Sequence, residues 1–169
     1  MDMNIYNGFS SWLDNAMSSG IPEESAAAYF CLYWEHGEHL WAVQLICTDD
    51  FNPDDDTGDW ACYDVFTTGE DLFRWDTDME WYDAQNTAEK LIEKYLSEGK
   101  YRETLKALHG VGVGFDDGDV TILYQNENST APKKNRPALD IAAMKERVKA
   151  KVNETLNDFL KTLDKNADK

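Results

Sequence analysis

Residues 28–47 read AYFCLYWEHGEHLWAVQLIC, and this stretch decides the fold. Its two ends, 28–34 and 40–47, are rich in aromatic and aliphatic side chains and are typical of β-strands. The segment between them, 35–39, is polar and contains a glycine. Two strand-forming runs joined by a short polar connection predict a β-hairpin.

Periodicities on either side of this hairpin predict the remaining elements. Phe9, Trp12 and Met17 recur at helical spacing and Gly20 follows them, which predicts a short N-terminal helix. The further strands predicted are 60–67, 72–75, 111–115 and 120–124, the last two joined by a turn that contains an Asp-Gly pair. The further helices predicted are 79–98, which has one apolar face and a glycine after it, and 101–108.

These elements predict an α+β fold. We expect an N-terminal helix, an antiparallel sheet of about five strands, one long helix packed on the sheet and a C-terminal amphipathic helix. The expected domain is residues 1–125, with 26 acidic and 6 basic side chains and therefore a net charge of −20. A linker with two prolines follows at 126–137, and 138–169 is the amphipathic helix. Residues 126–169 hold 7 acids and 10 bases, a net charge of +3.

The charge is distributed unevenly along the chain. Residues 1–89 hold 20 carboxylates and one cation, Arg74, within a total net charge of −17. Such a field repels phosphate backbones and anionic membrane surfaces, and it attracts basic proteins. We therefore expect a basic protein partner, with no direct binding of nucleic acid or membrane. High net charge also keeps a protein soluble, which is the simpler explanation.

Composition bounds the class of protein. Aromatic residues make up 12% of the chain, whereas disordered acidic chains are poor in them, so we expect a folded domain. The three cysteines, Cys31, Cys47 and Cys62, lack CxxC spacing, and their odd number argues against a disulfide framework. The N-terminus has no secretory signal pattern and no apolar run could span a membrane. A cytoplasmic location is expected.

Motifs for metals and catalysis are weak. The segment 50–56 alternates oxygen ligands as a calcium loop does, but Asp55 and Ala61 stand where an EF-hand needs glycine and glutamate. Weak cation binding by segment 50–56 remains an alternative. His36 and His39 lack the i, i+4 spacing of zinc proteases, and we expect no metal or cofactor. Gly112 and Gly114 lack the third glycine of a dinucleotide loop, and the sequence has no enzyme signature.

Carboxylates and aromatics are interleaved between Asp49 and Asp83, where 13 acids alternate with eight aromatic residues. We expect most of these rings to be buried, but two exposed rings would act as anchors in an acidic field. The predicted partner-binding residues are Asp49, Asp50, Asp54, Asp55, Asp56, Asp59, Asp76, Asp78 and Glu80.

In size and composition the chain resembles the small acidic immunity proteins of bacterial toxin systems, which neutralise a basic toxin domain by covering it. This resemblance implies a non-catalytic inhibitor of a basic protein. Two alternatives stay open. A nucleic-acid mimic would need a continuous acidic ridge with the spacing of phosphates, and an enzyme without a readable motif would need a pocket with perturbed carboxylates or histidines. The C-terminal helix is expected to dock on the acidic domain or to self-associate.

Overall fold

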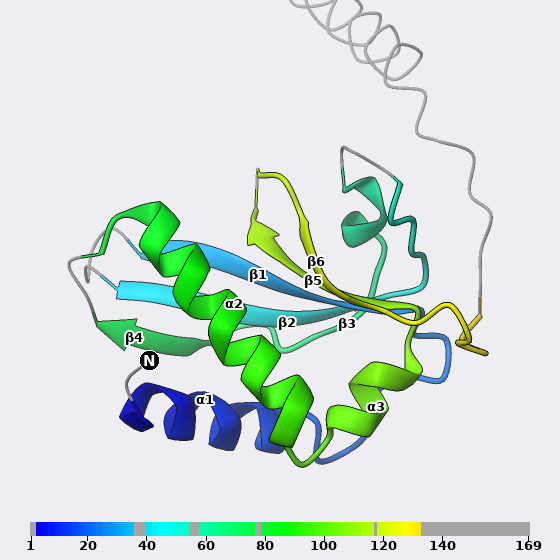
Figure 1. Cartoon of the computed structure of the whole chain (residues 1–169), viewed down its shortest axis with the longest axis horizontal. Helices are drawn as coiled ribbons and strands as arrows, with labels where there is room; N and C mark the ends of the chain where they lie inside the picture. Colours follow the sequence, from blue (N-terminus) through cyan, green and yellow to red (C-terminus); the bar gives the residue numbers. More distant parts are fainter. Residues whose placement is uncertain (1–2, 36–39, 55–57, 77–78, 117, 133–169) are drawn as a thin grey trace, which may run out of the picture. The chain divides into compact units, whose positions relative to one another are not determined.

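The computed structural model describes residues 3–35, 40–54, 58–76, 79–116 and 118–132. Its elements in chain order are helix α1 (Met3–Ala16), strands β1 (Ala27–Glu35) and β2 (Leu40–Thr48), the 3₁₀-helix η1 (Asp59–Cys62), strands β3 (Asp64–Thr67) and β4 (Phe73–Asp76), helices α2 (Trp81–Glu98) and α3 (Arg102–Ala107), and strands β5 (Gly110–Phe115) and β6 (Thr121–Gln125) (Figure 1).

The six strands form one mixed sheet in the order β3-β2-β1-β5-β6, and β4 also pairs with β2. Strands β3 and β4 occupy the same edge of β2, because β3 pairs with 46–48 and β4 with 40–43. The predicted α+β class and the predicted hairpin of β1 with β2 are confirmed. The expectation of a purely antiparallel sheet is wrong, since β1 and β5 run parallel.

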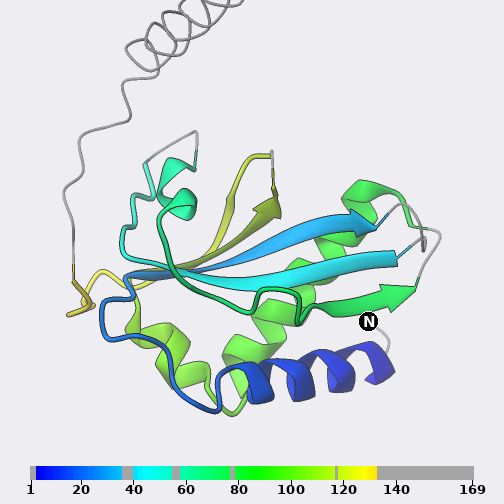
Figure 2. The same ribbon diagram turned by 180° about the vertical axis from the view of Figure 1, so that it is seen from behind.

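The parallel pair follows from the path of the chain. Helices α2 and α3 lie between β4 and β5 in the sequence, so they form the long crossover connection that a parallel strand requires. Figure 2 shows that α1, α2 and α3 lie on one face of the sheet, whereas the opposite face, called here the open face, carries the short η1 but no α-helix of the described residues. This crossover therefore gives the sheet two different faces.

The helix-covered face holds the main core. Alternate residues of the central strands point into it, as the two-residue period of a strand requires, and pack against α1 and α2. Phe9 on α1 lies within 6.2 Å of four aromatic rings, including Phe30 on β1 and Tyr95 on α2. Because Phe9 lies at the centre of these rings, its side chain is fully buried.

On the open face β5 presents glycines, because its sequence alternates Gly110-Val-Gly112-Val-Gly114. A Cβ at Gly110 would clash with the ring of Phe51, and a Cβ at Gly112 would lie 2.9 Å from Val120. The space that the missing side chains leave is filled by a second cluster that includes Trp60 of η1. The glycines thus admit a layer of rings on the face that α1, α2 and α3 do not cover.

One predicted strand, 60–67, differs in the structure. Residues 60–67 were predicted as one strand, but Trp60 lies in η1 and only Asp64–Thr67 pairs with β2. The buried Trp60 packs against Tyr29 with ring centroids 6.1 Å apart, and this contact favours the turn of 3₁₀-helix.

No helix in the described part of the chain has the length and apolarity to cross a membrane.

The first residues of the predicted linker are bonded to the body. Asn126 donates from its side chain to the carbonyl of Lys106 at 2.7 Å, and Ser129 donates to the carbonyl of Ala107, also at 2.7 Å. The predicted C-terminal helix, 138–169, and the connection 36–39 lie outside the described residues.

Replacing Gly114 by alanine is expected to lower the free energy of unfolding by about 1–3 kcal/mol, the usual cost of overpacking. The new Cβ would lie 2.5 Å from the backbone oxygen of Asp119, which cannot move without shifting the turn. Urea denaturation of the full chain measures this. A change below about 0.5 kcal/mol, the size expected at an ordinary surface position, would contradict the close approach.

Candidate functional site

The predicted acidic residues have different environments. Asp49 is 5% exposed, so burial removes its carboxylate from any contact surface. Asp50 is half-buried and accepts a hydrogen bond from the backbone N–H of Phe51 at 2.8 Å. Asp54 is exposed and Asp59 is half-buried at the start of η1.

The second predicted cluster precedes α2. The backbone of Asp76 pairs with Leu40 at the end of β4, and Glu80 is exposed at the N-cap position of α2. Asp55, Asp56 and Asp78 lie outside the described residues. The described acids of the two clusters therefore belong to separate elements.

The N-terminal turn of α2 carries two exposed rings, Trp81 at 60% and Tyr82 at 51% exposure. Their ring centroids are 6.0 Å apart. The carboxylates of Glu80 and Asp83 flank them and are exposed. Acidic residues at this position also stabilise a helix through its dipole, so their presence has a structural reason besides any contact. We call Trp81 and Tyr82 the aromatic anchor.

A row of rings supports the anchor from beneath. Trp81 lies 6.2 Å from Phe115, Phe115 lies 5.8 Å from Trp41, and Trp41 lies 4.7 Å from Trp34, measured between centroids. Trp41 is buried, so the row extends from the core to the surface. This support holds one edge of the Trp81 ring and leaves most of the side chain in solvent.

The open face contains a cavity of about 430 Å³, which we call the open-face cavity. Its lining comes from β1, β2, β3, η1 and the turn after β5. The lining residues are Tyr29, Cys31, Gln44, Ile46, Gly58, Ala61, Cys62, Asp64, Thr67, Asp116, Gly118 and Val120. Among these described residues there is no Lys, Arg or His, and two are carboxylates.

Hydrogen bonds fix the polar side chains near the cavity. The hydroxyl of Tyr29 donates to the carbonyl of Phe115 at 3.0 Å. The hydroxyl of Tyr33 donates to Oε1 of Gln44 at 2.9 Å, and Nε2 of Gln44 donates to the carbonyl of Gly69 at 2.8 Å. The donors of Tyr29, Tyr33 and Gln44 are thus directed at protein acceptors.

Burial keeps both tyrosines neutral. It is the main cause that raises the pKa of Tyr29 and of Tyr33 above the ordinary value of 10.0, and the neighbouring Cys31 is the next. The carboxylate of Asp116 raises the pKa of both phenols further. The negative potential of Asp116 therefore reaches the floor of the open face.

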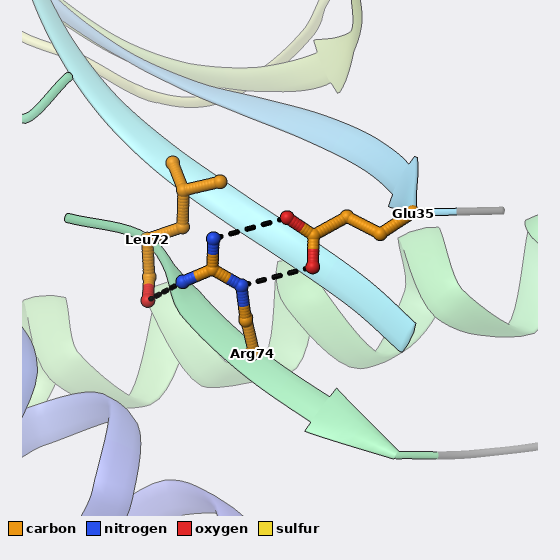
Figure 3. Close-up of polar contacts among 3 residues, drawn as sticks. All are labelled: Glu35, Leu72 and Arg74. Carbon is orange, nitrogen blue, oxygen red and sulfur yellow. Dashed lines mark hydrogen bonds and ion pairs between the residues drawn. The ribbon is translucent and has the colours of Figure 1, made fainter. Parts of the chain in front are cut away.

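Arg74 of β4 lies on the open face and is held by an ion pair. Its Nε and Nη2 donate to the two carboxylate oxygens of Glu35 at 2.9 and 3.0 Å, and its Nη1 donates to the carbonyl of Leu72 at 3.4 Å (Figure 3). Figure 3 shows this pair reaching across β2 from both sides. A partly exposed pair adds little stability, but here it neutralises the cation that β4 carries.

The other described cations lie on the side of the helices. They are Lys90, Lys94, Lys100, Arg102 and Lys106, and they belong to α2, α3 and the turn between these helices. Lys94 pairs with Glu98 at 3.5 Å and also lies over the ring of Tyr6. Within the described residues, the cations other than the paired Arg74 therefore lie away from the open face and from the first turn of α2.

Metal ligands do not gather in the described part of the chain, where no three His, Cys, Asp or Glu side chains could hold an ion. His109 is buried, and its Nε2 lies 2.6 Å from the carbonyl of Ala131, which gives it a structural role. His36 and His39 lie outside the described residues.

Comparison of the chain with protein-family models, with curated proteins and with solved structures found no match. The candidate surfaces therefore depend on geometry alone. Sequence reasoning included Trp81 and Tyr82 among the eight aromatic residues between Asp49 and Asp83 but did not single them out as the exposed pair. It missed the open-face cavity, whose lining comes from strands, η1 and a turn that are distant in the sequence.

The thiols are expected to differ in reactivity. Cys62 is exposed, whereas Cys31 and Cys47 are buried, and burial raises the pKa of Cys47 to about 12. Because the thiolate is the reactive form, titration with Ellman's reagent should label one thiol per chain quickly and two more after unfolding in urea. Rapid labelling of all three, or a Cys62→Ser variant that keeps the fast phase, would contradict this assignment.

Stability is expected to fall at alkaline pH. The pKa of Tyr29 in the folded chain lies above its unfolded value of about 10. Its contribution to the free energy of unfolding is therefore intact below about pH 10 and is lost as pH rises. At about pH 10.5 the free energy of unfolding falls by about 0.8 kcal/mol for one such tyrosine. Urea unfolding of the native chain and of Tyr29→Phe between about pH 8 and about pH 10.5 measures the difference in slope. Identical slopes would contradict the raised pKa.

Proposed function

We propose that this chain is a non-catalytic acidic binding protein that sequesters or inhibits a basic protein partner, as immunity proteins do. The single observation that carries the proposal is the aromatic anchor. Trp81 and Tyr82 are more than half exposed and are flanked by Glu80 and Asp83, while the described lysines lie elsewhere on α2 and beyond.

The rings, their support and the surrounding carboxylates each contribute to binding in a different way. Tryptophan and tyrosine are enriched among the few residues that carry most of the energy of an interface. The row of rings beneath Trp81 holds the anchor in place before a partner arrives, which reduces the entropy lost on binding. The surrounding carboxylates favour a partner of positive charge and increase the rate of encounter at low salt.

The neutralised Arg74 is consistent with the same proposal. A cation on the open face would repel a basic partner, but Glu35 binds this one through both oxygens. The remaining described cations are confined to 90–106. A basic surface that approaches the start of α2 or the open face therefore meets carboxylates.

The two alternatives have less support. Exposed carboxylates occur on separate elements, such as Glu93 on α2 and Glu103 on α3, and lysines stand between them, whereas a nucleic-acid mimic needs an uninterrupted ridge. An enzyme would need titratable groups poised for proton transfer. The open-face cavity offers Tyr29 with a raised pKa, which keeps a proton at neutral pH.

Replacing Trp81 by alanine is expected to weaken partner binding at least tenfold, because a supported tryptophan at an interface is worth about 2 kcal/mol or more. The full chain is immobilised, basic proteins from its host are captured, and affinities are measured between about 0.1 M and about 1 M salt. Circular dichroism checks that the variant is folded.

Charge variants separate steering from contact. Glu80→Gln with Asp83→Asn should slow association and flatten its salt dependence, whereas Glu93→Gln, a matched change on the same helix, should have no effect. The proposal fails if no captured partner is basic, or if Trp81→Ala binds the partner as well as the native chain does.

A further inference from the structure

We propose that the open-face cavity is a receptor for an arginine side chain. The occupant is an arginine of the basic partner, so the inference rests on the proposed function and adds a second contact to the aromatic anchor. Its grounds are the shape of the cavity, the hydrogen-bond chemistry of its lining and its charge.

The cavity is shaped to accept a long side chain with an apolar stem. Its floor is Tyr29, Cys31 and Ile46, and η1 and the turn after β5 form two of its walls. Gly58 and Gly118 line these walls, and a Cβ at Gly58 would lie 2.6 Å from the side chain of Val120. A volume of about 430 Å³ falls within the usual range of small ligand sites.

The lining offers acceptors to an incoming donor. The carboxylates of Asp64 and Asp116 are exposed and come from different elements, β3 and the turn after β5. The Tyr29 hydroxyl and the Gln44 amide donate their protons to backbone carbonyls, as described above. Guanidinium has five N–H donors and no acceptor, so it complements such a lining.

Arginine fits this lining better than lysine does. Its planar group bonds several oxygens at once and stacks on aromatic rings, and it is more weakly hydrated than an ammonium. A tyrosine floor with carboxylates on separate elements uses each of these properties. Lysine would offer a compact, strongly hydrated charge with a larger desolvation cost.

The cavity and the aromatic anchor lie on opposite faces of the sheet. The ring of Phe115 contacts Trp81 on the helix-covered face, with centroids 6.2 Å apart, and the next residue, Asp116, lines the cavity on the open face. A single partner would occupy both features only by reaching around the end of β5.

The test uses the full chain and N-acetyl-arginine amide as the probe. We expect binding in about the millimolar range, as for a single side chain. Two readouts are local to the cavity: the NMR shift of the Ile46 methyl groups and the rate at which iodoacetamide alkylates Cys62, which should fall. The neutral isostere N-acetyl-citrulline amide should change neither readout, and N-acetyl-lysine amide should bind more weakly.

Variants test which carboxylates bind the arginine probe. Asp64→Asn and Asp116→Asn should each weaken binding of the arginine probe at least threefold. Asp119→Asn, a matched change in the same turn at a residue that does not line the cavity, should have little effect. NMR spectra of the variants without probe verify that they are folded.

Three outcomes would overturn the inference: no response of Ile46 and Cys62 to the arginine probe, equal binding of the lysine or citrulline analogue, or an equal loss in Asp119→Asn. None of these bears on capture of a basic protein through Trp81. Conversely, a response to the arginine probe without any captured basic partner would support the cavity assignment and reject the proposed function.

Discussion

The parallel pairing of β1 with β5 is the constraint on which the rest of the structure depends. It aligns Tyr29 with Gly112 and Cys31 with Gly114, so glycines stand beside large side chains on the open face, while Val111 and Val113 point into the main core. A strand of alternating glycine and valine can serve both faces because the side-chain period of a strand is two. With larger residues at the glycine positions, Trp60 and Phe51 could not pack there.

The fold also sorts the charge that the sequence carries. Of the six described cations, five fall between residues 90 and 106 and the sixth is bonded to Glu35. A long amphipathic helix accommodates lysines readily, because their stems cover apolar surface while their charges stay in water. Lys94 over the ring of Tyr6, 3.9 Å from its centroid, is an example. Apart from the paired Arg74, the described cations thereby lie away from the open face.

The elements with a clear period could be predicted from the sequence, and those set by tertiary contacts could not. The hairpin of β1 and β2, the helix after Met79 and the β5–β6 hairpin follow from hydrophobic pattern and turn residues. Strand direction for β5 depends on a crossover that no local pattern encodes. The turn at Trp60 depends on a ring contact with Tyr29, which is distant in the sequence, so the local pattern does not distinguish this turn from a strand. Burial of Asp49 likewise comes from long-range packing, whereas exposure of Glu80 follows from its place before a helix.

A negative field by itself attracts any basic protein and distinguishes none of them, since long-range electrostatics mainly affects the rate of encounter. Selectivity requires shaped contacts that a wrong partner leaves unfilled. The two proposed contacts are of this kind and lie on opposite faces of the sheet, a supported tryptophan beside Phe115 and a cavity lined by Asp116. Because an aromatic ring and a guanidinium must meet them at a fixed separation, the pair would select among basic surfaces by geometry. The field would then govern how fast a partner arrives, and the two contacts how long it stays.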